Sequence, residues 1–532
     1  MKFTTEGLYA SRRSPVMARN IVSTSQPLAA QAGLRMLAAG GNAADAALAA
    51  AIALPVVEPT GNGLGSDAYA IIWDGKEIHG LNASGRAPAA WSPERFAGQE
   101  TMPQRGWESV TVPGAVSAWR AISDKFGKLP FEKLFDPAID YASRGFAVSP
   151  IIAQLWANGA KVLQDQPGFA EAFMPGGKTP KAGELFVNPA MAESLRDIAE
   201  TGGDSFYKGR LAKKIADFAR QHGAALNEED LANHKADWCG TISQEFGDVA
   251  LHEIPPNGQG ISALMALGIL RHCQLERFGP DDPEALHLEI EAMKLAFADL
   301  HTYVADLDHM REVTVEHLLS DKYLASRAAL IDPARAQDFK AGAPEHGGTV
   351  YVTAADESGM MVSFIQSNYL GFGSGVVVPG TSISLQNRGH GFSLQPGHPN
   401  QVAGGKRPFQ TIIPAFLMGR DGNPVMSFGV MGGPMQAQGH LQMTLRTQLW
   451  RQDPQTAADA PRWQAISGLD VAVEHVLGDQ TITALRAKGH NILVETPDQT
   501  NFGFGGAQLI AKTDAGYVAG SDPRKDGCAV GF

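Results

Sequence analysis

The sequence predicts an α+β fold in which layers of helix and strand pack together, and three observations support this class. The chain has 532 residues, enough for several hydrophobic cores. Its first part carries apolar residues at helical spacing, whereas its last part shows the alternation of short strands. A stretch rich in Pro, Ala, Gly and charged residues, 332–348, lies between the two parts and predicts an exposed linker.

Several segments before the linker have the apolar spacing of helices. Residues 28–39 and 43–54 predict two helices, because Gly40-Gly41-Asn42 between them stops one and restarts the next. A glycine-rich loop, 61–67, then leads into a strand at 68–73. Further helices are predicted at 116–126, 137–144, 191–201 and 286–303.

After the linker the pattern changes to short strands. Residues 349–354 and 361–366 flank the turn Asp356-Glu357-Ser358-Gly359, which predicts a β-hairpin. Further strands are predicted at 411–417, 424–429 and 508–512.

Composition and charge exclude several classes of partner. The net charge is −12 and no basic run occurs, so we expect no nucleic-acid partner. An acidic surface also disfavours anionic membranes. The apolar run 43–57 is too short to span a bilayer, and no apolar signal region follows Met1. We therefore expect a cytoplasmic protein without a membrane partner.

Metal and cofactor motifs do not emerge from the sequence. The three cysteines, Cys239, Cys273 and Cys528, are too far apart for a zinc site or a disulfide framework. Gly61 to Gly65 reads G-x-G-x-G and precedes a strand, which differs from a dinucleotide-binding loop. The histidines lack ligand spacing, so we expect no metal and no cofactor.

The stretch His346-Gly347-Gly348-Thr349 leads from the linker into the first strand of the last part. Cleavage between Gly348 and Thr349 would give the threonine hydroxyl a general base on its own residue, the new α-amine. That amine has an unperturbed pKa of roughly 7.7–8.0, close to the pH at which a proton acceptor works best. A threonine after two glycines is also ordinary at the start of a strand, so the pattern by itself leaves both interpretations open.

Two further stretches carry candidate chemistry. Gly432-Gly433 follows a strand-like run and can aim two backbone N–H groups at one point, as in an oxyanion hole, or form a plain tight turn. Arg388 lies among glycines in the stretch 386–392. Its planar fork suits bidentate carboxylate binding, and a solvated surface arginine is the alternative.

These sequence motifs, in the order in which they occur, resemble those of the gamma-glutamyltranspeptidase family of self-cleaving N-terminal-nucleophile hydrolases. The resemblance covers nearly the whole chain. It rests on ordered matches at 39–46, 58–65, 85–88, 109–114, 137–139, Gly405-Lys406-Arg407-Pro408, Met431-Gly432-Gly433, Ala460-Pro461-Arg462 and Ser521-Asp522-Pro523-Arg524.

The resemblance implies one four-layer αββα sandwich, formed jointly by both halves of a self-cleaved precursor. Cleavage at the Gly348–Thr349 bond would give a large helix-rich fragment, 1–348, and a small strand-rich fragment, 349–532. The two fragments would stay together as a heterodimer within one structural domain, and further oligomerisation is compatible with this arrangement.

The resemblance also assigns catalytic roles to residues of this chain. It implies that Thr349 is the nucleophile and that Gly432 and Gly433 are the oxyanion donors. The supporting hydroxyl of the family falls on Ser367, where threonine is usual. Two positions later the family has asparagine, whereas this chain has Tyr369.

One departure from the family changes the charge expected beside the substrate. Members that transfer glutamyl groups hold the substrate α-amino group with a Gln and an Asp, in a strand that here reads Asn387 to Gly391. Arg388 and Gly391 occupy those two positions, so the amine-binding carboxylate is missing and a cation is present. A glutamyl ammonium beside Arg388 would be repelled, at a cost of several kcal/mol in a closed site.

Other departures concern the substrate carboxylate. The family's carboxylate-binding arginine is replaced by Ser84, with Arg86 two residues further on. The paired serines that contact the same carboxylate are replaced by Gln410 and Thr411. The stretch 393–406 is short, so the lid loop of some members is expected to be missing.

These departures predict an amidohydrolase for a small amide that carries a carboxylate, similar to oxamate amidohydrolases or glutaryl-cephalosporin acylases, acting through a threonine acyl-enzyme. A true gamma-glutamyl transferase is one alternative, and an unprocessed, non-catalytic binding protein is another. The expected substrate-binding residues are Arg388, Arg86, Tyr369, Asn387, Gln410 and Thr411.

Overall fold

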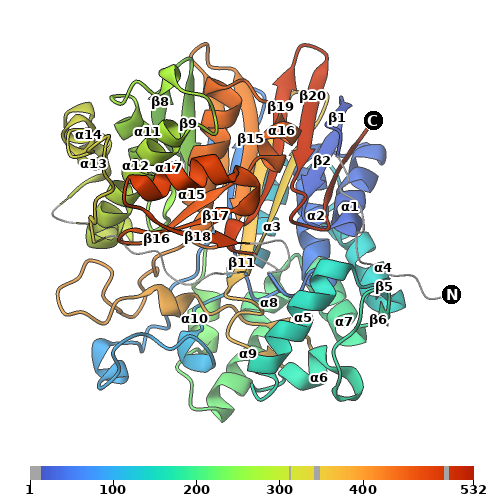
Figure 1. The fold of residues 1–532 in the computed structure, drawn as a ribbon. Helices are drawn as coiled ribbons and strands as arrows, with labels where there is room; N and C mark the ends of the chain where they lie inside the picture. The colour runs from blue at the N-terminus through green and yellow to red at the C-terminus, as the bar shows by residue number, and fades with distance from the viewer. Residues whose placement is uncertain (1–12, 311–312, 341–347, 496–501) are drawn as a thin grey trace.

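The computed structural model describes residues 13–310, 313–340, 348–495 and 502–532. Two seven-stranded sheets stack face to face, and helices cover the outer face of each (Figure 1). This confirms the predicted four-layer αββα sandwich. The His346-Gly347 part of the linker motif lies outside the described residues.

The first sheet takes its centre from residues after the linker and both edges from residues before it. Neighbouring strands are antiparallel throughout. In spatial order its strands are β1 (Val16–Ala18), β20 (Gly516–Ser521), β19 (Gly506–Thr513), β15 (Pro424–Met431), β14 (Ala415–Gly419), β9 (Val249–Glu253) and β8 (Ile242–Phe246).

The second sheet also combines strands from both parts of the chain. Strand β10, which contains Thr349, lies near its centre and pairs with β2 on one side and β11 on the other. In spatial order the strands are β21 (Cys528–Gly531), β2 (Ile21–Thr24), β10 (Gly348–Ala355), β11 (Met361–Tyr369), β3 (Asp67–Trp73), β4 (Ile78–Asn82) and β7 (Asp237–Trp238).

Strand β3 shows why its residues form a strand that is buried on both faces. Ala68, Ala70 and Ile72 belong to the core beneath the helices, whereas Tyr69 and Ile71 belong to the core between the two sheets. Successive side chains of a strand point to opposite faces, so one apolar run fills two cores.

The helices divide between the two outer faces. Figure 1 shows α5 to α10 gathered in the lower half of the view, below the strands. Among the described residues, none of the helices combines the length and the apolar character needed to cross a bilayer. The helices packed on the second sheet or below it are α1 (Pro27–Ala38), α2 (Ala43–Val57), α3 (Ala115–Phe126), α4 (Asp136–Arg144), α5 (Pro150–Leu163), α6 (Phe169–Phe173), α7 (Pro189–Glu200), α8 (Asp204–Lys208), α9 (Arg210–Gln221) and α10 (Glu228–Ala232).

The remaining helices belong to the other side of the molecule, where a small third sheet also packs against the core. They are α11 (Gly260–Leu270), α12 (Pro283–Tyr303), α13 (Val315–Leu318), α14 (Asp321–Ala328), α15 (Met435–Thr444), α16 (Pro454–Asp459) and α17 (Asp479–Ala487), and the third sheet consists of β16 (Trp463–Ser467), β17 (Asp470–Glu474) and β18 (Asn491–Glu495).

Two predicted strands near the candidate site are wrong in part. The strand predicted over 411–417 begins only at Ala415, because residues before it bond to side chains instead of a neighbouring strand. In the stretch 387–391, the residues Arg388–Gly391 form a short 3-10 helix and not a strand.

Two of the motifs that carry the resemblance meet in a buried ion cluster just beyond the end of β20. Arg462 Nη2 lies 2.5 Å from Asp522 Oδ2, and neither side chain is exposed. Arg524 bonds both Asp522, at 3.1 Å, and Glu474, at 2.5 Å. Although burial opposes ionisation, Arg462 and Arg524 lower the pKa of Asp522 to about 2. These motif residues therefore have a structural role, because they join α16, β17 and the end of β20.

We expect Asp522→Ala to destabilise the protein by about 3–5 kcal/mol, because it leaves the Arg462 guanidinium buried without its partner. Arg144→Ala, which removes one member of an exposed pair with Asp140, is the control and should cost less than about 0.5 kcal/mol. Thermal unfolding followed by circular dichroism measures both, and equal shifts for the two variants would contradict this interpretation.

Candidate active site

Thr349 lies at an irregularity near the start of β10. Gly348 pairs with Tyr369 and Val350 pairs with Gln366, so the register shifts across Thr349. Such a bulge takes a residue out of the regular ladder and redirects its side chain. A Cβ on Gly348 would lie 2.9 Å from the Thr60 carbonyl oxygen, so a glycine is needed before the threonine.

The hydroxyl groups of Thr349 and Ser367 form a hydrogen-bond chain with a fixed direction. Ser367 Oγ lies 2.6 Å from the Gly348 carbonyl oxygen, which only accepts, so Ser367 donates its proton there. Thr349 Oγ1 lies 3.2 Å from Ser367 Oγ and must therefore donate in that contact. The backbone N–H of Tyr369 also donates to Ser367 Oγ, at 2.8 Å. The chain runs from Thr349 to Ser367 to the Gly348 carbonyl.

Gly432 and Gly433 form the turn between β15 and α15. Their φ angles are 123° and 58°, a region that glycine adopts readily and other residues rarely do. The carbonyl groups of this pair accept the backbone N–H groups of Met435 and Gln436, which start the helix. Gln259 Nε2 donates to the Gly433 carbonyl at 2.8 Å.

Gln436 connects this turn to the threonine. Its side chain is fully buried, and its Nε2 donates to Thr349 Oγ1 at 3.4 Å. Its Oε1 accepts the backbone N–H of Ile413 at 3.0 Å. The structure thus connects Thr349 to Ser367 directly and to the Gly432-Gly433 turn through Gln436.

Arg388 is fully buried, which rules out the surface alternative. Its guanidinium lies over the ring of Tyr369, with Cζ 4.1 Å from the ring centroid. Its Nη1 donates to Thr411 Oγ1 at 2.9 Å. Tyr369 holds a φ of 76°, which is strained for an aromatic residue and places its ring under the guanidinium.

Among the described residues, no hydrogen-bond acceptor contacts the edge of the Arg388 guanidinium that Nε and Nη2 form. Nε and Nη2 are buried and have no hydrogen-bond partner among the residues that the structure describes. These two atoms lie on the same edge of the guanidinium and are the pair that binds a carboxylate side-on. Burial lowers the pKa of Arg388, while Tyr369 and Asp67 oppose that shift. An anion placed against the fork would complete both its hydrogen bonds and its charge balance.

Asp67, at the start of β3, is the buried acid that interacts with Arg388. Burial raises its pKa to about 7, although Arg388 and hydrogen bonds from the Gly85 N–H and the Gln410 amide lower it. Gln410 Nε2 donates to Asp67 Oδ2 at 2.6 Å and to Ser84 Oγ at 3.1 Å. Near neutral pH this carboxyl is therefore divided between its neutral and charged forms.

Two other predicted binding residues have different surroundings. Arg86 is 43% exposed, and its Nη1 lies 3.2 Å from the Gly405 carbonyl and 3.5 Å from Asp306. Asn387 accepts the N–H of Leu370 and donates to the Gln104 carbonyl, so its amide holds two loops together.

Three residues that contact the site were missed from the sequence. Asp67 is the last residue of the glycine-rich loop 61–67 and places a charge at the start of an apolar strand, which is a signal present in the sequence. Gln259 and Gln436 gave no such signal, because glutamine is common and their partners lie far away in the sequence.

One buried cluster offers atoms of the type that bind metals. His287, Glu291 and His490 each place such an atom within 4.8 Å of the others. His287 Nδ1 and His490 Nε2 are bonded directly at 2.8 Å, however, and Glu291 lies 2.5 Å from Lys294. One nitrogen of each histidine is thus engaged by the other ring, and Glu291 is already paired with an ammonium group, which disfavours a cation.

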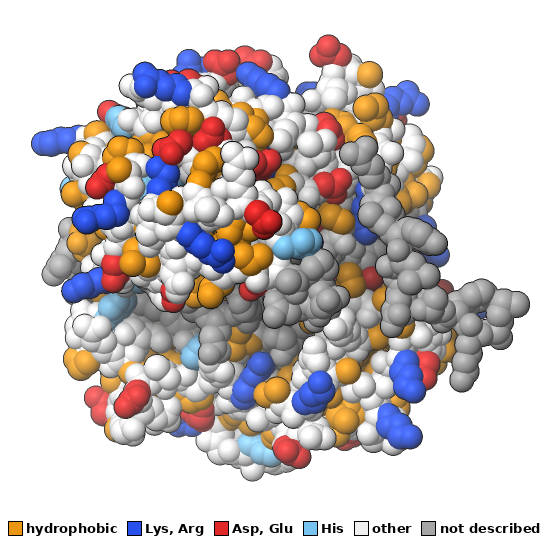
Figure 2. All heavy atoms as spheres, viewed as in Figure 1, with side chains coloured by type: hydrophobic (Ala, Val, Ile, Leu, Met, Phe, Trp, Pro, Cys, Tyr) orange, Lys and Arg blue, Asp and Glu red, His pale blue; other side chains and the backbone are white. Residues whose placement is uncertain are grey.

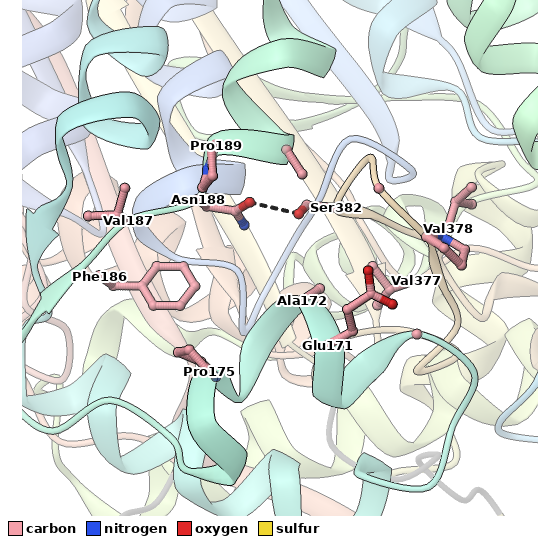
Figure 3. Close-up of a pocket in the computed structure, with 14 residues that line it drawn as sticks. Glu171, Ala172, Pro175, Phe186, Val187, Asn188, Pro189, Val377, Val378 and Ser382 are labelled. Atoms are coloured by element: carbon pink, nitrogen blue, oxygen red, sulfur yellow. Dashed lines mark hydrogen bonds between the residues drawn. The ribbon is translucent and has the colours of Figure 1, made fainter.

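A cavity of about 200 Å³ lies between α6 and the segment 377–382 (Figure 3). In it the side chain of Asn188 accepts a hydrogen bond from Ser382 at 2.7 Å. Neither Thr349 nor Arg388 lines it, so it is separate from the candidate site.

On the face seen in Figure 2, basic and acidic side chains are mixed.

Comparison with known proteins identifies the class and the family. The gamma-glutamyltranspeptidase family model matches residues 29–532. The oxamate amidohydrolase proenzyme of Klebsiella pneumoniae is 37% identical, over 95% of this chain and 97% of its own length. The glutathione hydrolase-like YwrD proenzyme of Bacillus subtilis is 34% identical, over 98% of this chain and 100% of its own length.

A solved structure agrees with these matches across the whole fold. Cephalosporin acylase from Bacillus halodurans is 45% identical and superimposes with a TM-score of 0.94, covering 100% of this chain and 99% of that one. The fold and these relatives define an N-terminal-nucleophile hydrolase. The chain belongs to the gamma-glutamyltranspeptidase family and is an amidohydrolase or acyltransferase of that type.

Proposed function

We propose that this protein is a self-processing amidohydrolase whose Thr349, once it becomes N-terminal, cleaves the amide bond of a small substrate that carries a carboxylate. The observation that carries this proposal is the buried Arg388 fork, whose Nε and Nη2 have no hydrogen-bond partner among the described residues. Relatives named oxamate amidohydrolase and cephalosporin acylase support an oxamate-like or glutaryl-like amide.

Processing begins in the precursor with the hydrogen-bond chain of Thr349. The threonine oxygen attacks the Gly348 carbonyl carbon while its proton passes to Ser367 and the Ser367 proton passes to the carbonyl oxygen. As this intermediate collapses, its hydroxyl proton passes to the Thr349 nitrogen, the Gly348–Thr349 C–N bond breaks and an ester is left. Water then hydrolyses the ester, which releases the Gly348 carboxylate and frees the Thr349 hydroxyl and α-amine.

Turnover uses the same hydroxyl with its own amine as general base. The Thr349 oxygen attacks the substrate amide, the N–H groups of Gly432 and Gly433 stabilise the oxyanion, and the leaving amine takes the proton. Water or another amine then removes the acyl group. Arg388 holds the far carboxylate of the acyl chain, with Tyr369 beneath its guanidinium and Thr411 bonded to its other edge.

We expect freshly purified protein to run as two bands on a denaturing gel, and the smaller one to begin Thr-Val-Tyr-Val by Edman sequencing. Thr349→Ala should stay as one band near 56.5 kDa and show no turnover, because both steps need the hydroxyl. A single wild-type band after long incubation would favour the non-catalytic binding protein.

Replacement of Arg388 should abolish recognition of the carboxylate. We expect Arg388→Met to lower kcat/KM for glutaryl-p-nitroanilide by about a hundredfold, since it removes a buried bidentate charge pair of about 3 kcal/mol. Arg86→Met is the matched control and should change kcat/KM less than about threefold, as expected for an exposed cation. The opposite ranking would assign the carboxylate to Arg86. Preference of the wild type for γ-glutamyl-p-nitroanilide would favour the transferase alternative.

Carboxylate binding should weaken as the pH rises through about 7. Above that pH Asp67 ionises, and its negative charge competes with the ligand for Arg388. The inhibition constant of glutarate should then rise by up to about tenfold per pH unit. Asp67→Asn should remove this dependence, whereas an unchanged slope in the variant would assign the titration to another group.

A further inference from the structure

We propose that Gln436 is a positioning residue that fixes the direction of the Thr349 hydroxyl proton and ties this nucleophile to the loop that holds Arg388. This inference rests on the proposed function, because it concerns the same nucleophile. It is independent of which amide serves as substrate.

The orientation of the Gln436 amide follows from its partners. The Ile413 N–H needs an acceptor, so the 3.0 Å contact places Gln436 Oε1 there. The amide nitrogen is then turned toward Thr349 Oγ1, at 3.4 Å, where it donates. Gln436 lies in the first turn of α15 and is fully buried, so its side chain has little freedom to turn away.

A donor at this position decides where the threonine proton points. Thr349 Oγ1 has one proton and two lone pairs, and Gln436 occupies one lone pair. The proton is thus directed to Ser367 in the precursor. After cleavage the α-amine is the acceptor on the same residue, and the Gln436 contact keeps the proton available to it. Both cleavage and turnover therefore depend on this one amide.

The same amide also connects the nucleophile to the substrate-binding loop. Ile413 lies two residues after Thr411, the partner of Arg388. Gln259 makes a parallel connection, because its Nε2 donates to the Thr411 carbonyl at 2.5 Å and the Gly433 carbonyl at 2.8 Å. Nucleophile, oxyanion turn and Arg388 are thereby held at a fixed separation.

The test compares Gln436→Met with Gln438→Met. Gln438 lies on the same helix and is equally buried, but it bonds the backbone of Pro434 and Ala465. Each variant loses an acceptor for one backbone N–H and a donor, so the structural damage is matched. We expect the half-time of self-cleavage to lengthen about tenfold in Gln436→Met relative to Gln438→Met, as the loss of one hydrogen bond allows. The kcat for glutaryl-p-nitroanilide should fall by a similar factor, with KM changed less than about twofold.

Gln436→Glu supplies a pH-dependent readout that a purely structural role would not move. A protonated glutamic acid keeps both the acceptor for Ile413 and a donor for Thr349, whereas the carboxylate cannot donate. We expect its deficit in cleavage rate relative to wild type to grow as pH rises.

The outcomes separate this inference from the proposed function. Equal cleavage half-times for Gln436→Met and Gln438→Met, or a Gln436→Glu deficit that is constant with pH, overturn the role of Gln436 while wild-type processing stands. A wild-type protein that never cleaves overturns both proposals. The cleavage half-time requires no substrate, so it decides the matter whatever amide the enzyme uses.

Discussion

The position of Thr349 on a strand that is paired along both edges is the constraint on which the rest of the site depends. Strand β10 bonds to β2 and to β11, so its backbone is fixed by the sheet. The bulge after Gly348 then takes one residue out of that regular order. Ser367, on the neighbouring strand, reaches both the threonine hydroxyl and the preceding carbonyl because the two strands are hydrogen-bonded. A threonine on a loop would not have its partners at such fixed distances.

The proposed carboxylate-binding part of the site depends on the burial of the Arg388 guanidinium. A guanidinium without solvent and with one edge unbonded is costly unless an anion completes it. Asp67 supplies part of the compensating charge, and its raised pKa means that the compensation is incomplete near neutral pH. The Tyr369 ring lies below the guanidinium at the expense of a positive φ. Asparagine, which the family resemblance places at this position, tolerates that conformation better but offers no ring. The strain of Tyr369 thus accompanies the stacking of its ring against Arg388, the residue that we propose binds the substrate carboxylate.

Much of the fold could be predicted from the sequence because local patterns decide it. Helix α2 follows from Asn42 and Asp45, which cap each other across its first turn, and from the apolar run behind them. The hairpin of β10 and β11 follows from alternation around one turn. The strands predicted at 411–414 and 387–391 were wrong, because glutamine side chains and a buried charge determine the backbone conformation there. Such contacts join residues far apart in the chain and leave no periodic signal. The positions of Thr349, Ser367, Gly432 and Gly433 came from ordered motifs, whereas Asp67, Gln259 and Gln436 emerged only from three-dimensional contacts.

Each of the two large sheets interleaves strands from both sides of the Gly348–Thr349 bond. If that bond is cut as we propose, the two fragments could separate only by breaking the hydrogen bonds between neighbouring strands at several places inside both sheets. Dilution therefore offers no route to dissociation, and the specific activity of the cut enzyme should be independent of its concentration. A gene divided at this point would face the reverse difficulty, because each piece would emerge with open strand edges that only the other piece can cover.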